Sequence, residues 1–376
     1  MRKISGSILI LSLCAALAAG CGSDSTFQVK GTIAGAKNGT LYLQKEEEGH
    51  YLNVDSLEMG KNGKFEFTGD ATEPQMYYLA FGKAAPVLSF FAESGTITID
   101  ARIDSLQKAK VKAGREQELY DEFLSYIRDF SGKKDKVYLD ILRSSAVDGD
   151  KDSIEVYRSM YQSLERRQAQ FVANFVLTHS DSRVAPLMAH TFLNQGYSPL
   201  LDSLVKSMSP EVADSKYGRE FAGFVSAAKN TLVGMSAPDF ELKKDTTAYS
   251  LSSFAGKELF LVVWSAGNQE NIDYMSALKQ VYGKWHDRGL EVLSSCISQN
   301  DEQYGYDIYS LNLPWAEVRD ARGMKNTLID KFALTGNLPA GLLIGRDGTI
   351  LARYITPEDL DKVLDYLSKN AYKSNK

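Results

Sequence analysis

The chain has 376 residues, of which 44% are hydrophobic and 24% are charged. This length and composition are typical of two or three folded domains, and they exclude a single small module and a disordered or collagen-like chain. The sequence has 43 Lys and Arg residues against 48 Asp and Glu residues, which gives a net charge of −5. Such a chain lacks the basic field that holds a phosphate backbone, so we do not expect nucleic acid as a partner.

The N-terminus has the layout of an export signal. Arg2 and Lys3 precede an apolar run over residues 8–19, and small residues stand directly before Cys21. The run is shorter than the roughly 20 residues that span a bilayer, so we expect cleavage rather than retention. The arrangement resembles a bacterial lipoprotein signal over residues 1–20. The resemblance implies that Cys21 carries a lipid and anchors the protein in the cell envelope, on the periplasmic or surface face of the outer membrane; an ordinary secretory signal is the alternative.

The cysteine count limits the chemistry of the mature chain. Of three cysteines, Cys14 lies in the signal and Cys21 would be acylated, which leaves Cys296. No disulfide can then form within the mature chain, although an oxidising envelope compartment would permit one. We therefore expect packed cores to supply the stability.

After a tether at residues 21–26, residues 27–114 have the pattern of a β-rich domain. Apolar and polar residues alternate, and Asn38-Gly39 and Asn62-Gly63 are hairpin turn signals. The expected strands cover residues 27–33, 40–43, 64–67, 77–81, 87–91 and 96–99. This pattern predicts an antiparallel sandwich or small barrel.

Residues 115–232 change to a helical period, with apolar residues three and four apart. We expect four to six helices in an up-and-down arrangement, with a polar break at residues 144–152. His179 and His190 lie here without a Cys or acidic partner at metal-ligand spacing. Structural roles are expected for both histidines, and no metal site.

Residues 233–376 alternate between strands and helices. The expected strands cover residues 260–264, 290–297, 316–319, 341–345 and 349–353, and the expected helices cover residues 272–288, 302–310, 324–332 and 357–369. The apolar run Phe260-Leu-Val-Val-Trp264 is typical of a central parallel strand. A βαβ unit, a second helix, and a hairpin with a terminal helix together predict an α/β domain of the thioredoxin layout.

Several motifs give this part a more specific resemblance. They lie at residues 233–242, 251–257, 259–264, 313–315 and 343–350. In order and spacing they resemble the redoxin superfamily, which includes thiol-specific antioxidant peroxidases and membrane-anchored thiol-disulfide oxidoreductases. The β-rich part, through motifs such as Gly63-Lys-Phe-Glu-Phe67, resembles the domain that precedes such modules in lipoproteins of the Bacteroidetes.

The resemblance implies a pair of cysteines, two residues apart, at the start of the first helix. There the free amides and the helix dipole stabilise a thiolate. In this sequence the two positions are Asn268 and Asn271, in the string Asn-Gln-Glu-Asn, so both nucleophiles are missing. An acidic residue and a proline expected further along the helix are replaced by Tyr274 and Ser276.

Two interpretations of this string remain open. Asn is a good helix N-cap, and Glu270 places a negative charge at the positive helix end, which is consistent with a retired active site that is simply capped. Alternatively, Asn268, Gln269 and Asn271 form a hydrogen-bonding surface for a ligand.

A second feature of the resemblance is Pro339, which implies a cis proline that faces the motif and exposes the backbone of Leu338 to an extended peptide. Backbone pairing with a peptide needs no thiol. The alternative is that Pro339 only completes a turn. The candidate binding residues are therefore Trp264, Asn268, Gln269, Glu270, Asn271, Leu338 and Pro339.

These observations favour a redox-inactive thioredoxin-like domain that acts as a binding or scaffold module, with an extended peptide or a partner envelope protein as its partner. Cys296 lies midway along an expected apolar strand, where a thiol is buried and inert. The sequence contains no Gly-x-Ser-x-Gly elbow, Walker loop or His-Glu-x-x-His motif that would indicate another kind of active site. We expect no cofactor. The alternative is a thiol-disulfide oxidoreductase or peroxidase that uses Cys296 or a partner's thiol.

Overall fold

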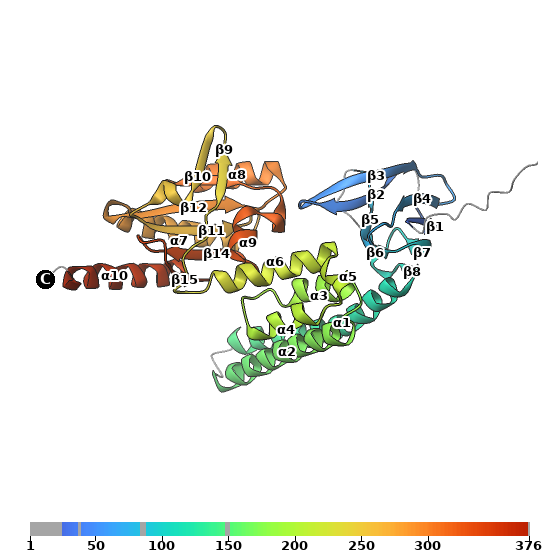
Figure 1. Cartoon of the computed structure of the whole chain (residues 1–376), viewed down its shortest axis with the longest axis horizontal. Helices are drawn as coiled ribbons and strands as arrows, with labels where there is room; N and C mark the ends of the chain where they lie inside the picture. The colour runs from blue at the N-terminus through green and yellow to red at the C-terminus, as the bar shows by residue number, and fades with distance from the viewer. Residues whose placement is uncertain (1–24, 37–38, 83–87, 147–150, 375–376) are drawn as a thin grey trace, which may run out of the picture.

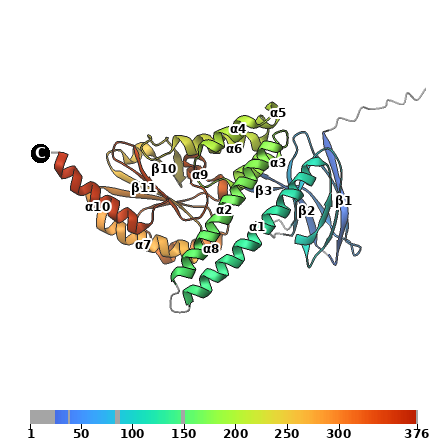
Figure 2. The ribbon, with the colours of Figure 1, turned by 90° about the horizontal axis from the view of Figure 1, so that it is seen from below.

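The computed structural model describes residues 25–36, 39–82, 88–146 and 151–374. The export signal, with Cys14 and Cys21, lies outside these residues. In the described part, a β-rich domain, a helical segment and an α/β domain follow one another along the chain (Figure 1). Seen from below, the helical segment lies between the other two domains (Figure 2).

The β-rich domain is a sandwich of two four-stranded sheets. Its strands are β1 (Thr26–Ala34), β2 (Thr40–Glu47), β3 (His50–Glu58), β4 (Lys64–Asp70), β5 (Gln75–Phe81), β6 (Leu88–Ala92), β7 (Gly95–Arg102) and β8 (Lys110–Lys112). The sheet orders are β4-β1-β7-β8 and β3-β2-β5-β6. Alternate residues such as Val29, Leu43 and Phe67 point inward and fill the core between the sheets.

One pairing corrects the expectation of an antiparallel sandwich. β1 and β7 pair in parallel, with Val29 opposite Ile97, so the first sheet is mixed. Parallel neighbours need a crossover connection, and here the second sheet supplies it, since β2, β3, β5 and β6 lie between these two strands in the sequence. Their backbones approach closely at Gly31, where a Cβ would lie 1.8 Å from the carbonyl oxygen of Ile99.

The helical segment contains six helices among its described residues, within the expected range. They are α1 (Arg115–Ala146), α2 (Lys151–Thr178), α3 (Val184–Phe192), α4 (Pro199–Ser207), α5 (Pro210–Ala213) and α6 (Lys216–Asn230). α1 and α2 form a long antiparallel hairpin. The shorter helices pack near its base around buried residues such as Phe123, Val176 and Phe221. His179 has the expected structural role, since its Nδ1 lies 2.9 Å from the carbonyl oxygen of Phe175.

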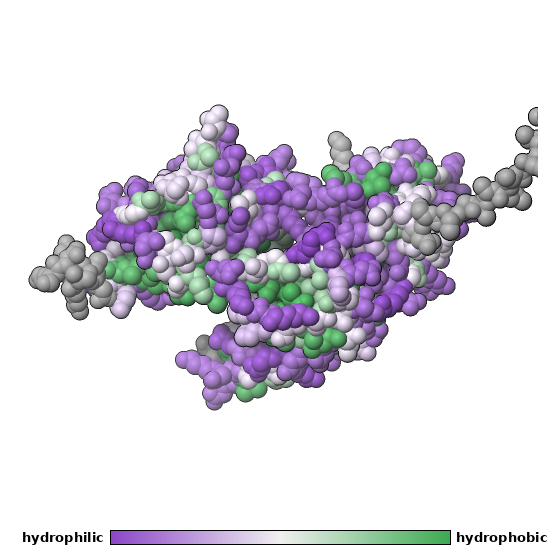
Figure 3. All heavy atoms as spheres, viewed as in Figure 1, coloured by the Kyte–Doolittle hydropathy of each residue, from purple (hydrophilic) through white to green (hydrophobic). Residues whose placement is uncertain are grey.

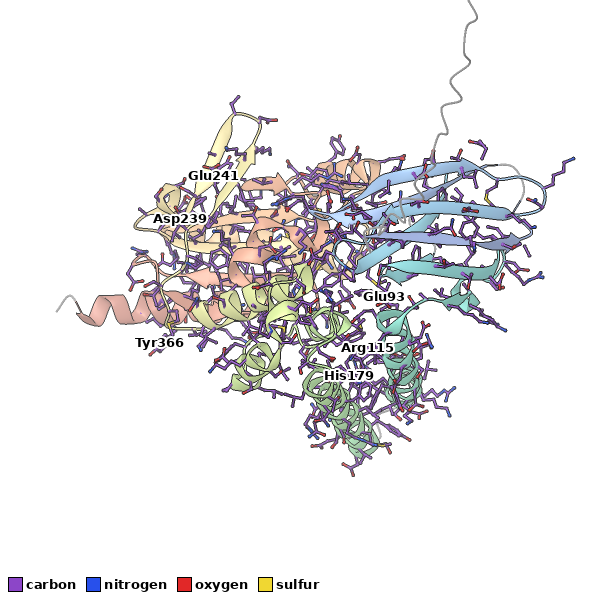
Figure 4. All side chains as sticks on the ribbon, turned by 45° about the vertical axis from the view of Figure 1, so that its right-hand side comes forward. Glu93, Arg115, His179, Asp239, Glu241 and Tyr366 are labelled. Atoms are coloured by element: carbon purple, nitrogen blue, oxygen red, sulfur yellow. The ribbon has the colours of Figure 1, made fainter. Side chains whose placement is uncertain are left out.

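The helical segment covers the outer face of the second sheet. Met76 and Phe91 point outward from β5 and β6 into the helical core. The hydroxyl of Tyr217 accepts a hydrogen bond of 2.9 Å from the N–H of Met76. At the start of α1, Glu93 accepts a hydrogen bond of 2.9 Å from the N–H of Glu116; Figure 4 labels Glu93 at this junction. The two parts are therefore joined by a shared core.

The α/β domain is built on a five-stranded sheet of order β13-β12-β11-β14-β15. Its elements are β9 (Glu241–Lys244), β10 (Thr247–Ser250), β11 (Glu258–Trp264), α7 (Gln269–Trp285), β12 (Leu290–Cys296), α8 (Asp301–Leu311), β13 (Ala316–Arg319), α9 (Thr327–Phe332), β14 (Ala340–Ile344), β15 (Ile350–Arg353) and α10 (Pro357–Ser374). β11, β12 and β13 are parallel, and β14 runs antiparallel to β11. This is the thioredoxin-like fold that the sequence predicts, with an additional β9–β10 hairpin.

Two hydrophobic cores hold this sheet. On one face, α7 and α10 pack through residues such as Leu278 and Leu360. On the other face, α9 and β9 contribute residues such as Phe332 and Leu242. Because β11 is central and covered on both sides, its residues from Leu259 to Trp264 are all buried.

The tip of the β2–β3 hairpin reaches the α/β domain (Figure 1). The side-chain amide of Gln299 donates a hydrogen bond of 2.8 Å to the carbonyl oxygen of Gly49. A Cβ at Gly49 would lie 1.8 Å from the carbonyl oxygen of Arg322, and the φ angle of Gly49 is +78°. Only glycine tolerates both conditions.

No helix in the described ranges is both long and apolar enough to cross a bilayer. The face seen in Figure 3 is mainly hydrophilic, with hydrophobic residues gathered in patches.

Candidate functional site

The candidate site begins where β11 ends and α7 starts. Asn268 is the N-cap of α7, as predicted, and its Oδ1 accepts a hydrogen bond of 3.1 Å from the N–H of Asn271. Asn268, Gln269 and Glu270 are all exposed. Gln269 donates a hydrogen bond of 2.8 Å to Asp273 one turn along the helix. The helix terminus thus presents amide and carboxylate groups where the resemblance implies a thiolate.

Asn271 points into the protein. Its side chain is 1% exposed, its Oδ1 accepts a hydrogen bond of 2.9 Å from the N–H of Ser265, and its Nδ2 donates one of 3.1 Å to the carbonyl oxygen of Leu338. Asn271 therefore ties together the end of β11, the first turn of α7 and the loop before β14. It is a buried crosslink, and its burial keeps the amide from contacting a ligand at the surface.

The loop before β14 contains the expected cis peptide bond, between Leu338 and Pro339. Both residues are partly exposed. Within the described residues, the N–H of Leu338 has no hydrogen-bond partner, while its carbonyl oxygen is held by Asn271. The helical segment borders the same loop, because the hydroxyl of Thr335 donates to the carbonyl oxygen of Asn194.

Trp264 corrects one expectation. It is 0% exposed, because it is the last residue of the central strand and its indole lies in the core. Its Nε1 donates a hydrogen bond of 3.1 Å to Glu317. Trp264 therefore cannot contact a ligand at the surface, and only Asn268, Gln269, Glu270 and the Leu338–Pro339 backbone remain accessible among the candidate residues.

A buried polar network lies behind the site, and sequence reasoning missed it. Glu317 accepts hydrogen bonds from Trp264 and Ser294, and Ser294 accepts one of 2.8 Å from the indole of Trp315. The Oε1 of Glu317 has no partner among the described residues. Burial raises the pKa of Glu317 to about 7, against the opposing hydrogen bonds. The only sequence signal was a carboxylate inside a short predicted strand.

Cys296 lies in the sheet beneath this network. It is the last residue of β12, opposite Trp264 on β11 and Arg319 on β13, and is 0% exposed. Burial raises the pKa of its thiol to about 11, although the N–H of Ser298 and the charge of Arg319 act in the opposite direction. A thiol of this kind is neither ionised nor accessible near neutral pH.

No group of three or more His, Cys, Asp or Glu side chains in the described parts of the chain is arranged to hold a metal ion.

The sheet order, the capped helix after β11 and the cis-proline loop facing it define a thioredoxin-like domain. Comparisons with known proteins find similarity over this domain to proteins named as thiol-disulfide oxidoreductases. The chain is 23% identical to the thiol-disulfide oxidoreductase ResA of Bacillus thuringiensis over 150 residues. This aligned region covers 40% of this chain and 84% of the relative. The ResA protein of Bacillus anthracis matches over the same length and at the same identity.

Solved structures show the same similarity over this domain. A thiol-disulfide oxidoreductase from Bacteroides fragilis is 26% identical, with 35% of this chain and 98% of that chain covered and a TM-score of 0.33. The thioredoxin domain of a thiol-disulfide oxidoreductase from Bacteroides vulgatus is 20% identical, with 36% of this chain and 97% of that chain covered and a TM-score of 0.33. At the other end, a family model described as a domain of unknown function, DUF4369, matches residues 27–120.

Proposed function

We propose that this protein is a cell-envelope lipoprotein, anchored through Cys21, whose thioredoxin-like domain performs no thiol-disulfide exchange and binds extended peptide segments of partner envelope proteins. The observation that carries the proposal is the chemistry at the start of α7. Asn268 and Asn271 stand at the two positions of the expected cysteine motif, and the thiol of Cys296 is buried. The Asn-Gln-Glu-Asn string is then a degenerate form of that motif.

The missing sulfur rules the reaction out at this position. Thiol-disulfide exchange requires a thiolate that attacks a disulfide sulfur and forms a mixed disulfide. An amide side chain cannot act as that nucleophile. Asn268 uses its oxygen to cap α7, and Asn271 uses both ends of its amide inside the protein. The first turn of α7 is thus stabilised as a structural element.

The peptide-binding part of the proposal depends on the loop beside α7. The N–H of Leu338 has no internal partner among the described residues, so it can donate to the backbone of an extended segment, as in other cases of strand addition. Asn268, Gln269 and Glu270 are exposed next to it on the helix terminus and would contact side chains of the bound segment.

Binding can be measured with a defined unfolded peptide, the carboxymethylated insulin B chain, by fluorescence anisotropy. Leu338→Pro removes the N–H and should weaken binding at least about fivefold, whereas Leu338→Ala keeps the N–H and should change it less than about twofold. Circular dichroism of both variants checks that the fold is retained. If the natural protein does not bind the peptide, or if both variants bind equally well, the peptide-binding role is wrong.

The proposed lipid anchor is tested separately by replacing the sulfur atom of Cys21 that would carry the lipid. Cys21→Ser should move the protein from the membrane fraction to the soluble fraction of a bacterial host and abolish labelling by a palmitate analogue. Cys14→Ser is the matched control, since Cys14 lies inside the proposed signal and should leave both results unchanged. Labelling that persists in Cys21→Ser would contradict lipidation at this residue.

The rival function is that of the relatives, whose names describe thiol-disulfide oxidoreductases. On this chain it would require Cys296 to react directly or with a partner's thiol. The burial of Cys296 and its raised pKa oppose this function. Rapid modification of Cys296 by a maleimide in the native state would favour the rival, whereas modification only after addition of urea would support the proposal made here.

A further inference from the structure

A cavity lies between the helical segment and the α/β domain. Its walls come from α3 and α6 on one side, and from α9 with the short 3-10 turn Gly323–Lys325 on the other. In Figure 1, α9 lies directly beside α6. The volume is about 510 Å³, which is within the range of small-molecule sites, and such sites occur preferentially between domains. The cavity shares no lining residue with the site at Asn268 and Leu338.

The two walls are fixed relative to each other. Lys325 and Glu220 form an ion pair of 2.9 Å across the domain border. The guanidinium of Arg353 donates to the backbone carbonyls of Thr231 and Phe332, which joins the end of α6 to the sheet and to the end of α9. A cavity whose walls are tied in this way is preformed, so a ligand does not bear the cost of assembling it.

The cavity contains a carboxylate that the protein does not use. Asp330 on α9 is exposed into it, and its carboxylate accepts no hydrogen bond and forms no ion pair with any described residue. The nearby cation Lys325 is already held by Glu220. Burial raises the pKa of Asp330, and the charges of Lys325 and Arg322 act in the opposite direction.

The remaining lining supplies an apolar body and a neutral imidazole. Phe224, Met324 and Ile329 line the wall. The ring of His190 lies 5.2 Å from the ring of Phe224, and its two nitrogens have no hydrogen-bond partner among the described residues. Burial lowers the pKa of His190 to about 4, so near neutral pH its ring is uncharged. His190 therefore provides a flat surface and hydrogen-bonding groups, but no positive charge.

We propose that this cavity binds a small organic cation with an aromatic or aliphatic body. The ammonium group would pair with Asp330, and the body would lie against Phe224 and His190. The carboxylates of Asp330 and Glu220 outnumber the single lining cation Lys325, so an anion is disfavoured by like-charge repulsion. The described side chains also lack a cluster that could hold a metal ion. This inference does not depend on the function proposed for the α7 site.

Tryptamine and indole-3-propionate form a suitable pair of probes, because they share an indole body and differ in the sign of the charge. With the mature chain, isothermal titration should show tryptamine bound at least about tenfold more tightly than indole-3-propionate, which corresponds to about 1.4 kcal/mol. Asp330→Asn should weaken the binding of tryptamine at least about tenfold. Asp245→Asn, in the exposed β9–β10 turn, is the control and should leave the affinity for tryptamine unchanged.

A second variant blocks the cavity without touching its charge. Gly223 on α6 lines the space, and a Cβ built there meets no atom within 4 Å. Gly223→Leu should therefore fold normally and abolish tryptamine binding. The proposal is overturned if the natural protein does not bind tryptamine at about 5 mM, if the two probes bind equally, or if Asp330→Asn or Gly223→Leu binds tryptamine as the natural protein does.

Discussion

The stability of the α/β domain should depend on pH through Glu317, and Glu317→Gln isolates that dependence. The carboxylate is buried, and its Oε2 accepts hydrogen bonds from Trp264 and Ser294. Glutamine keeps an oxygen that can accept both bonds, but it cannot ionise. The ionisable groups that act on this cluster from neighbouring elements are Lys244, Cys296, Tyr304 and Arg319.

The magnitude follows from the shift in the pKa of Glu317. Burial raises this pKa from 4.5 to about 7 in the folded protein, so between these values the native state binds more protons than the unfolded state. The contribution to stability is fully present below about pH 4.5 and is lost as pH rises through 7. Between pH 5 and pH 8 the free energy of unfolding should fall by about 2.5 kcal/mol on account of this one group.

Urea unfolding at pH 5 and pH 8, followed by tryptophan fluorescence, measures this effect in the right domain, because all three tryptophans lie in it. Glu317→Gln should lose most of the 2.5 kcal/mol pH dependence and be the more stable protein at pH 8. Glu302→Gln, at an exposed position of α8, is the control and should behave as the natural protein. An unchanged pH dependence in Glu317→Gln would mean that Glu317 is not the group whose titration changes the stability.

Two further predictions concern the crosslinks around the site. Asn271→Ala leaves the N–H of Ser265 and the carbonyl oxygen of Leu338 unpaired, so it should lower the free energy of unfolding by about 1–3 kcal/mol. Gln269→Ala, at the exposed surface, should lower it by less than about 0.5 kcal/mol. Equal losses of stability in urea unfolding would contradict the inward role of Asn271. Gly49→Ala should detach the β2–β3 hairpin from Arg322 and speed hydrogen exchange at both contact segments, whereas Gly82→Ala, a left-handed glycine in open space, should not. Unchanged exchange in Gly49→Ala would mean that the hairpin contact does not depend on close approach.

Local signals in the sequence were sufficient to predict many of the helices and strands of the α/β domain. The apolar run at residues 260–264 is a buried central strand, and Asn268 caps the helix that follows it. Thr356 caps the terminal helix, accepting a hydrogen bond of 3.1 Å from the N–H of Asp359. Each of these features depends on residues close together in the chain, so periodicity and capping chemistry predict them well.

Features that depend on distant residues could not be predicted in this way. The parallel pairing of β1 with β7 depends on strands that are distant in the sequence. β3 is exposed along nearly its whole length, so neither of its faces contributes to a core. Asn271 turns inward because its amide finds a carbonyl 67 residues away. The cavity at Asp330 is lined by α3 and α6 on one side and by α9 on the other, so neither domain alone contains it.

The absence of thiol-disulfide exchange can be measured by the reduction of insulin disulfides by dithiothreitol, with the mature protein as the catalyst. The natural protein should leave the rate at the dithiothreitol baseline, while Asn268→Cys combined with Asn271→Cys should raise the rate by placing two thiols at the start of α7. Acceleration by the natural protein that disappears in Cys296→Ser would show that the domain is an active oxidoreductase.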